Sequence, residues 1–498
     1  MRVTSKMMTT NSLNNINRNK ANMSTLANQY STQQKIQRPS EDPVTAVRSL
    51  KYRTSIAELT QFYKKNVPDA MSWISNTESA LTSVNDILTK MNTYFNQGAN
   101  DTLETSERDA LVQTLTEYKE QIFQCLNADY AGRYLFTGFR TDTSLIYSEA
   151  NNDVKYTITE EIDPANATIF SYVKGELEEN GTKDPSDYAK DAVSLEKSYR
   201  FSLSYNGVSN VNSIMSDGTE LLKVATVSNA DDNMYDLDAY NKTNPAGGPY
   251  GAIVIKETGE VITNKAGYEA LKGAKNLTIQ YDKQGFDKGD VRPEHYFTCS
   301  SVKYDSNGNV VETKNFQKPE QQHIQYEVNF SQSITVNTLA NETLNANIIN
   351  QVDDIIAQIE AVQKVEKKLS DIELKLKNGT YAIDEKDALI ELKAQIENEL
   401  ALNKSVLQEK FGNGITTTAN AQAGVNKAVA DLGSRYNRLE LTESRLSDQL
   451  TTFNEMLTKN DTVDLEEAVV NYTAALTAYN ASLNATAKIA QNSLLDFL

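Results

Sequence analysis

Histidine and cysteine, the residues that most often carry catalysis or bind transition metals, are rare in this chain. Its 498 residues include two histidines, His295 and His323, and two cysteines, Cys125 and Cys299. The sequence contains neither a His-Glu-x-x-His zinc motif nor the Gly-x-Ser-x-Gly turn of serine hydrolases. We therefore predict a protein that is not an enzyme, with no catalytic, cofactor-binding or metal-binding residues.

Two short segments still deserve a chemical interpretation. His295 and Cys299 are four residues apart in RPEHYFTCS, but a metal site would need further ligands, so we expect a pair on one strand. The glycine-rich run from Asn244 to Gly251 lacks the Lys-Ser/Thr pair of a phosphate-binding loop and is predicted to be an ordinary loop. The two cysteines are predicted to be packing thiols.

A third motif is Pro-Ser-Glu-Asp-Pro near the N-terminus, formed by Pro39, Ser40, Glu41, Asp42 and Pro43. Ser40 or Asp42 can cap a helix that starts near Pro43, because proline is favoured in the first helical turn. The motif can also mark a hinge between a terminal arm and a rod. Both roles are compatible.

Composition limits the possible partners. The net charge of -18 and the isoelectric point near 4.8 argue against nucleic-acid binding, which needs clustered Lys and Arg. No stretch approaches the roughly 18 apolar residues of a membrane span, and the N-terminus lacks the apolar core of a cleaved secretory signal. We expect no membrane association, and export, if it occurs, by a route without signal cleavage.

The two flanks of the chain carry apolar residues at helical spacing. Steps of three and four residues connect Val67, Ala70, Ile74, Thr77, Leu81, Val84, Leu88, Met91 and Phe95. A second stripe follows at Leu111, Leu115, Tyr118, Ile122 and Cys125. Near the C-terminus the pattern returns at Ile348, Val352, Ile355, Ile359, Val362, Glu366, Leu369, Glu373 and Leu376, and again from Val425 through Leu432, Leu439 and Leu446 to Leu457. These stripes predict long helical rods held within one subunit.

The middle of the chain has a different character. Residues 151–330 hold six of the nine prolines and thirteen of the twenty-one glycines. Short β-branched and aromatic runs lie between these turn residues, at Val154–Ile158, Tyr199–Tyr205, Leu277–Tyr281 and His323–Phe330. We predict a β-rich domain here.

The extreme ends form a further class. Residues 1–50 carry seven basic and two acidic side chains, whereas the C-terminal stripe from Leu465 is Ala-rich and weakly acidic. A basic helix and a weakly acidic helix are suited to pair as a coiled coil. In such a two-helix pair, each helix would still have one apolar face that its partner does not cover. We therefore predict contacts between subunits through Leu13, Ile16, Met23, Leu476, Leu483 and Leu494.

The predicted fold class is α+β, with long antiparallel coiled-coil rods from both chain ends bracketing a β-rich central domain. Residues 1–45 and 458–498 form the terminal helical assembly arms. Residues 46–150 and 331–457 form the helical rod domain, and residues 151–330 form the β-rich distal domain.

Three segments resemble the flagellar hook-associated protein 3 family of the flagellin superfamily. They are MRVTSKMM with QQKIQRPSEDPVTAVRSL (Gln33–Leu50), NADYAGRYLFTGFRTDT (Asn127–Thr143), and LGSRYNRLELTESRL (Leu432–Leu446) with the ending IAQNSLLDFL (Ile489–Leu498). At the position of Pro39 to Pro43, filament flagellins usually have a segment similar to Asn-Ser-Ala-Asp-Asp. The stretch Val365–Phe411 is longer and more charged than the usual return helices, which predicts an enlarged helical region.

The resemblance implies a structural subunit of the bacterial flagellum that joins hook to filament. Such a subunit would be exported unfolded through the flagellar type III channel and would act outside the cell. Its implied partners are further copies of itself in a ring or helical assembly, the neighbouring hook-associated protein, flagellin and an export chaperone, with no cofactor. Two alternatives remain open at this stage: a filament flagellin, and a secreted coiled-coil adhesin or effector.

Overall fold

The computed structural model describes residues 5–100, 105–164, 167–175, 193–229, 234–245, 248–305, 308–346, 348–378 and 383–495. The chain divides into two compact units. The first contains Met1–Met71, Tyr326–Ile334 and Asn437–Leu498, and the second contains Ser72–Gln325 and Thr335–Tyr436. Each unit therefore combines segments that are far apart in the sequence.

The first unit is built from the two chain ends. Its helices are α1 (Ser5–Thr32), α2 (Pro43–Gln61), α10 (Leu465–Leu495) and the C-terminal part of α9 (Ile383–Asp461). A single π-helical turn, Phe62–Asn66, joins α2 to α3 (Val67–Gly98). Tyr52 of α2 packs edge-on against Phe453 of α9, with ring centroids 6.2 Å apart. The long helices of this unit thus come from both flanks.

A short hairpin contacts the π-helical turn. It consists of β15 (Gln325–Asn329) and β16 (Gln332–Thr335), which pair only with each other among the described strands. Phe330 meets the Phe62 ring at 5.6 Å, and the Asn66 side chain donates to the Glu327 carbonyl at 2.8 Å. Within the run His323–Phe330, Gln325–Asn329 form the predicted β structure, and this strand pairs with β16 rather than with the strands of the central sheets.

Helix α3 confirms the first apolar stripe. All nine stripe residues from Val67 to Phe95 are at most 1% exposed. Helix α4 (Thr105–Leu126) buries Leu115 and Ile122 of the second stripe. Helix α3 approaches α9 closely, since a Cβ atom on Gly98 would lie 2.3 Å from the Phe411 ring and one on Gly414 would lie 2.8 Å from the Phe95 ring. Only glycine fits at these two positions.

The return helices follow the predicted periodicity with one shift. In α9, Val425, Leu432, Leu439 and Leu446 are fully buried at a strict spacing of seven. Helix α8 (Ile348–Asn378) buries the stripe through Val362 as predicted, but then buries Val365 and Ile372 instead of Glu366 and Glu373. The shift has a packing cause, because Val365 and Ile372 meet apolar partners on α9, namely Leu389, Leu392 and Ile396.

The remainder of the second unit contains two main sheets. A five-stranded sheet has the order β4-β5-β11-β10-β9, and a seven-stranded sheet has the order β14-β13-β3-β12-β7-β8, with β6 also on β12. The strands of the first are β4 (Thr168–Lys174), β5 (Ser194–Ser202), β9 (Val224–Val227), β10 (Ala252–Ile255) and β11 (Glu260–Thr263). Those of the second are β3 (Asn151–Ile162), β6 (Val208–Ser209), β7 (Ile214–Ser216), β8 (Thr219–Leu222), β12 (Leu277–Phe286), β13 (Thr298–Tyr304) and β14 (Val310–Phe316).

Alternating side chains of these strands build the core. Ala252 and Val254 of β10 enter the cluster that also contains Ile158, Ile279 and other residues of the second sheet. Ile253 and Ile255 point to the opposite face, where they meet Leu237 of α5 (Leu237–Thr243). Successive side chains of a strand point to opposite faces of the sheet, so one strand can contribute to two apolar layers. Helix α6 (Lys265–Gly273) contributes Leu271 to the larger cluster.

Two smaller elements complete the unit. Strands β1 (Asp129–Tyr130) and β2 (Arg133–Tyr134) form a hairpin whose turn residues, Ala131 and Gly132, have φ values of 52° and 76°. Positive φ at both central residues is typical of the tight turns that connect hairpin strands. Helix α7 (Ala340–Thr343) precedes α8. Together, the helical flanks and the central sheets, whose strands are antiparallel except for the parallel pair β9–β10, confirm the α+β fold class predicted from the sequence.

Candidate assembly site

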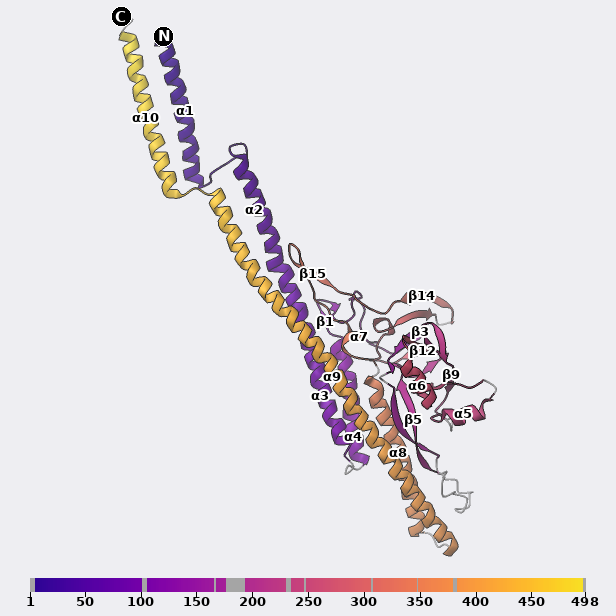
Figure 1. The fold of residues 1–498 in the computed structure, drawn as a ribbon. Coiled ribbons are helices and arrows are strands. Elements are labelled where there is room, and N and C mark those ends of the chain that lie inside the picture. The colour runs from indigo at the N-terminus through magenta and orange to yellow at the C-terminus, as the bar shows by residue number, and fades with distance from the viewer. Residues whose placement is uncertain are drawn as a thin grey trace. The chain divides into compact units, whose positions relative to one another are not determined.

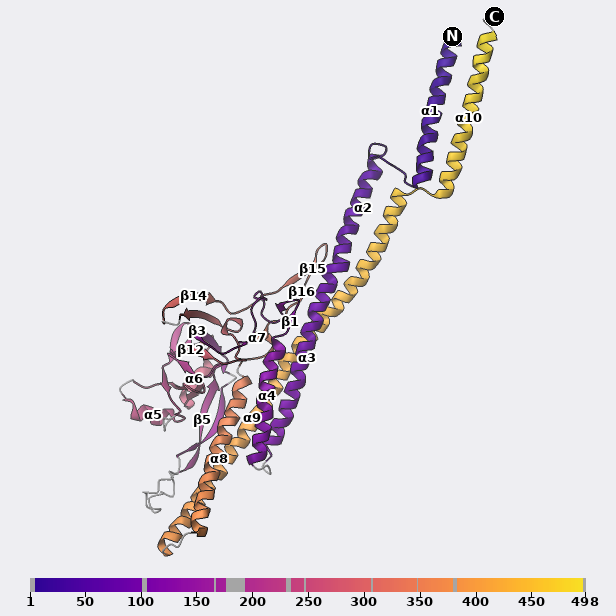
Figure 2. The same ribbon diagram turned by 180° about the vertical axis from the view of Figure 1, so that it is seen from behind.

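The two terminal helices pack against each other. The Asn19 side chain of α1 donates to the Ser482 hydroxyl of α10 at 2.5 Å, and the Tyr30 and Tyr472 rings stack at 6.0 Å. As the residue number rises in one helix it falls in the other, so the pair is antiparallel. Figures 1 and 2 both show α1 beside α10 with the two chain termini at the same end. The two arms of the chain therefore pair with each other, through a neutral hydrogen bond and a stacked pair of aromatic rings.

This pair leaves most of its surface open. Among the described side chains, none in α1 is buried and Ala468 is the one buried residue of α10. Large apolar side chains are exposed on both helices: Met7, Met8, Leu13 and Tyr30 on α1, and Leu465, Val469, Val470 and Leu483 on α10. In α3, by contrast, the whole apolar stripe is covered. Two helices alone cannot bury both faces, because each covers only one side of the other.

The six residues proposed for contacts between subunits have different environments in the single chain. Leu13 is 51% exposed and Leu483 is 41% exposed, whereas Ile16, Met23 and Leu476 are half-buried. Leu494 belongs to α10, but its side chain lies outside the described residues. Among the five whose side chains the structure describes, Leu13 and Leu483 are therefore the most exposed.

The Pro39 to Pro43 motif leads into the start of α2. Asp42 is the N-cap, and its carboxylate accepts hydrogen bonds from the backbone N–H groups of Val44 at 3.0 Å and Thr45 at 3.2 Å. The Thr45 hydroxyl also donates to this carboxylate at 2.6 Å and, with the backbone donors, lowers the pKa of Asp42. Pro43 takes the first helical position. Glu41 accepts from the Gln37 N–H at 2.9 Å, which closes the preceding loop.

Two linkers run between the arms and the long helices, and they hydrogen-bond to each other. The Lys35 N–H donates to the Asp461 carbonyl at 2.8 Å, and the Val463 N–H donates to the Gln33 carbonyl at 3.0 Å. The Asp461 carboxylate also accepts from Ser49 at 2.8 Å and pairs with Arg53 at 2.9 Å. A cavity of about 220 Å³ lies beside these groups. The arms thus join α2 and α9 through a paired strand-like segment, and its role as a hinge stays a prediction.

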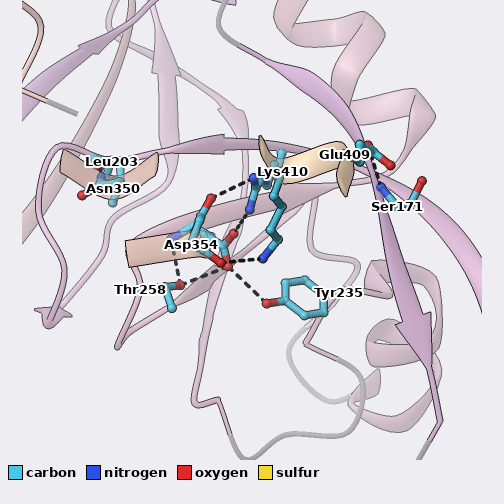
Figure 3. A network of polar contacts seen from close by, with 10 residues as sticks. Ser171, Leu203, Tyr235, Thr258, Asn350, Asp354, Glu409 and Lys410 are labelled. Atoms are coloured by element: carbon cyan, nitrogen blue, oxygen red, sulfur yellow. Dashed lines mark hydrogen bonds and ion pairs between the residues drawn. The ribbon is translucent and has the colours of Figure 1, made fainter. Parts of the chain in front are cut away.

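A buried ionic cluster in the second unit was not foreseen from the sequence. Arg200 of β5 forms ion pairs with Glu260 of β11 and, at 2.8 Å, with Asp354 of α8. Lys410 of α9 donates to the Asp354 carbonyl oxygen at 3.2 Å, and the Tyr235 hydroxyl donates to Glu260 at 3.3 Å. Figure 3 shows Tyr235, Asp354 and Lys410 of this network converging. The cluster connects the five-stranded sheet to the return helices.

Within this cluster, the neighbouring charges favour the ionised forms of Arg200 and Glu260, whereas burial raises the pKa of Asp354 and lowers that of Lys410. Arg200 is 4% exposed and Glu260 is 2% exposed. Burial by itself would lower the pKa of Arg200, but Asp354 and Glu260 outweigh it and raise the pKa. Burial would likewise raise the pKa of Glu260, but the Arg200 charge holds that pKa below its usual value. The Arg200 guanidinium also lies 4.9 Å from the centre of the Phe170 ring. Removing one partner of such a buried ion pair leaves an uncompensated charge in the interior, which is strongly destabilising.

His295 and Cys299 do not form the predicted pair on a strand. His295 ends a short 3-10 helix, Pro293–His295, because Pro293 starts a turn there, and only Cys299 lies on β13. The His295 Nε2 atom is 3.2 Å from the Ser144 carbonyl oxygen. Among the described residues, no group of three or more His, Cys, Asp and Glu side chains is placed to hold a metal ion. Cys125 and Cys299 are both free thiols, and Cys299 is buried.

The buried imidazole gives a prediction for stability against pH. Burial, with smaller contributions from Arg140 and Arg292, lowers the pKa of His295 to about 4. The unfolded chain binds this proton near pH 6.5, so the folded state is destabilised as the pH falls from about 6.5 to about 4, by up to about 3 kcal/mol. Urea unfolding at several pH values should show a smaller loss for His295→Gln than for the natural chain. Identical pH profiles for the two chains would contradict the assignment.

Comparisons with known proteins find similar sequences for both flanks of the chain. Residues 3–141 match the bacterial flagellin N-terminal helical region, and residues 415–498 match the bacterial flagellin C-terminal helical region. The flagellar hook-associated protein 3 of Salmonella typhimurium is 23% identical over 181 residues, which are 36% of this chain and 56% of that protein. A flagellin of Clostridium tyrobutyricum is 31% identical over 127 residues, which are 26% of this chain and 33% of that protein. The chain thus spans about half the length of the hook-associated relatives it matches.

Among solved structures, flagellar hook associated protein-3 from Legionella pneumophila is similar in structure. The match covers 82% of this chain and 97% of that protein, with 13% sequence identity and a TM-score of 0.29. In the part of this chain that the structure describes, no helix is long and apolar enough to cross a membrane. The geometry defines a protein whose two chain ends form one helical pair with open apolar faces. Both helical flanks of the chain are similar to the helical regions of bacterial flagellins, over residues 3–141 and 415–498.

Proposed function

We propose that this chain is a structural subunit of the bacterial flagellum that forms the junction between hook and filament. The observation that carries the proposal is the α1–α10 pair, whose apolar side chains remain exposed while those of α3 are covered. Apolar faces of this kind gain stability when further helices pack on them. Copies of the same chain supply such helices, so the terminal arms are the assembly site.

The choice of the junction over the filament depends on similarity. The relatives named hook-associated protein 3 match a longer part of this chain than the flagellin does, and the Pro39 to Pro43 motif differs from the usual flagellin run. In this role the chain acts outside the cell, is exported unfolded without signal cleavage and contacts a neighbouring hook-associated protein, flagellin and an export chaperone. It performs no catalysis and needs no cofactor.

Seeded polymerisation would distinguish the two structural roles. A junction subunit adds a short segment to isolated hook ends and then stops, whereas a filament flagellin continues to grow. We expect purified chain, mixed with such ends and viewed by electron microscopy, to add a short segment of constant length. Filaments that lengthen with protein concentration would support a filament flagellin instead, and the absence of any addition would contradict a role in assembly.

A further inference from the structure

Strand β14 forms one edge of the seven-stranded sheet. It pairs with β13 and with no other described strand, and both views of the ribbon place it at the free rim of this sheet (Figures 1 and 2). Every β14 side chain except Phe316 is exposed, and Val310 and Val311 are 60% and 61% exposed. An edge strand offers a row of backbone donors and acceptors to any strand that can lie beside it.

Natural edge strands are usually protected by proline, by short length or by charges. β14 is seven residues long and contains no proline. A bulge interrupts its pairing with β13 near Val310, but Glu312 to Phe316 keep a regular register. Its charged residues are Glu312 and Lys314, which lie on one face and pair with each other at 3.0 Å. Their opposite signs weaken the protection that charge gives, because the two can complement each other in a second strand.

The order of these charges selects one register for self-pairing. If two β14 strands run antiparallel with Thr313 opposite Thr313, Glu312 of each copy faces Lys314 of the other. A shift that centres the pair on Glu312 or on Lys314 would place like charges opposite each other, which is unfavourable. The favoured register also brings Val310 opposite Phe316, so an apolar contact lies at each end.

We propose that β14 docks against β14 of a second copy of this chain, antiparallel, about a two-fold axis at Thr313. The interface is small, so the dimer is weak. Because the contact is two-fold, it cannot join successive neighbours around one ring, which are related head to tail. It would instead join chains that are free or that belong to different assemblies. The inference does not depend on the terminal helices or on the proposed function.

Charge exchange tests the pairing. In Glu312→Lys chains both charges of β14 are positive, and in Lys314→Glu chains both are negative, so each variant alone should associate at least about tenfold more weakly than the natural chain. An equal mixture should recover the natural association, since every Lys then faces a Glu. Sedimentation of the full-length chains over a range of concentrations measures this. If neither variant is weaker, or if mixing recovers nothing, the proposal is wrong.

Cross-linking tests the register. Thr313→Cys places two thiols across the two-fold axis, within reach of a disulfide, whereas Asn315→Cys on the same strand faces Val311 of the second copy. Under mild oxidation the Thr313→Cys chain should form dimers faster than the Asn315→Cys chain. The natural chain, with its own two cysteines, is the background control. Equal rates for the two variants would contradict the register.

Discussion

Replacing Leu483 with aspartate is expected to abolish assembly while leaving the fold of the chain intact. Leu483 is 41% exposed on α10, so in the single chain a carboxylate at this position remains partly in water. In the polymer the same position would be covered by another copy, and burying an unpaired charge costs several kcal/mol. We expect polymerisation onto hook ends to fall by at least about a hundredfold.

The matched control is Thr477→Asp, which introduces the same charge at an exposed position of α10 outside the apolar stripe. This variant should assemble much more readily than Leu483→Asp. Circular dichroism and the melting temperature should be close to those of the natural chain for both. If Leu483→Asp assembles normally, the apolar face of the terminal pair does not hold subunits together, and the assembly site must be sought elsewhere.

Replacing Arg200 with methionine is expected to destabilise the second unit by about 3–5 kcal/mol. The change removes the positive charge that lies between Glu260 and Asp354. Methionine fills much of the same space, so the loss comes mainly from two carboxyl groups left without their partner. Denaturant unfolding, followed by the signals of the sheet and of the helices, measures the free energy of unfolding.

Lys197→Met is the control for this prediction, because Lys197 lies on the same strand and is exposed. It should change the free energy of unfolding by less than about 0.5 kcal/mol. A further variant that combines Arg200→Met with Glu260→Gln and Asp354→Asn should recover part of the loss, since it leaves no unpaired carboxylate. If Arg200→Met is no less stable than Lys197→Met, the cluster does not hold the sheet to the helices.

Local periodicity explains why the helical flanks were predictable. Each step of three or four residues keeps an apolar side chain on one helix face, so the stripe from Val67 to Phe95 could be identified before its partner was known. All of its residues are buried. The same method misplaced the end of the α8 stripe, where Leu389 and its neighbours on α9 determine which face is covered. Periodicity predicts which face of a helix is buried only as far along the helix as the packing partner stays the same.

Turn residues and short β runs likewise indicated the central sheets but not their pairing. Val154–Ile158, Tyr199–Tyr205 and Leu277–Tyr281 all overlap observed strands, yet the order of the strands joins segments distant in sequence. β3, for example, pairs with both β12 and β13. Many pairings satisfy the same alternation of side chains, and the choice among them depends on how the two sheets pack as a whole.

The amino-acid sequence was enough to predict the class of the fold, the helical flanks and their resemblance to flagellins, because these depend on local spacing and on motifs within short segments. It could not reveal that Arg200, Glu260 and Asp354 meet, since their ion pairs form only after strands and helices far apart in the chain are brought together. Nor could it show that β14 lies at the edge of a sheet with every side chain except that of Phe316 exposed. Those features depend on which neighbours each element acquires when the whole chain folds.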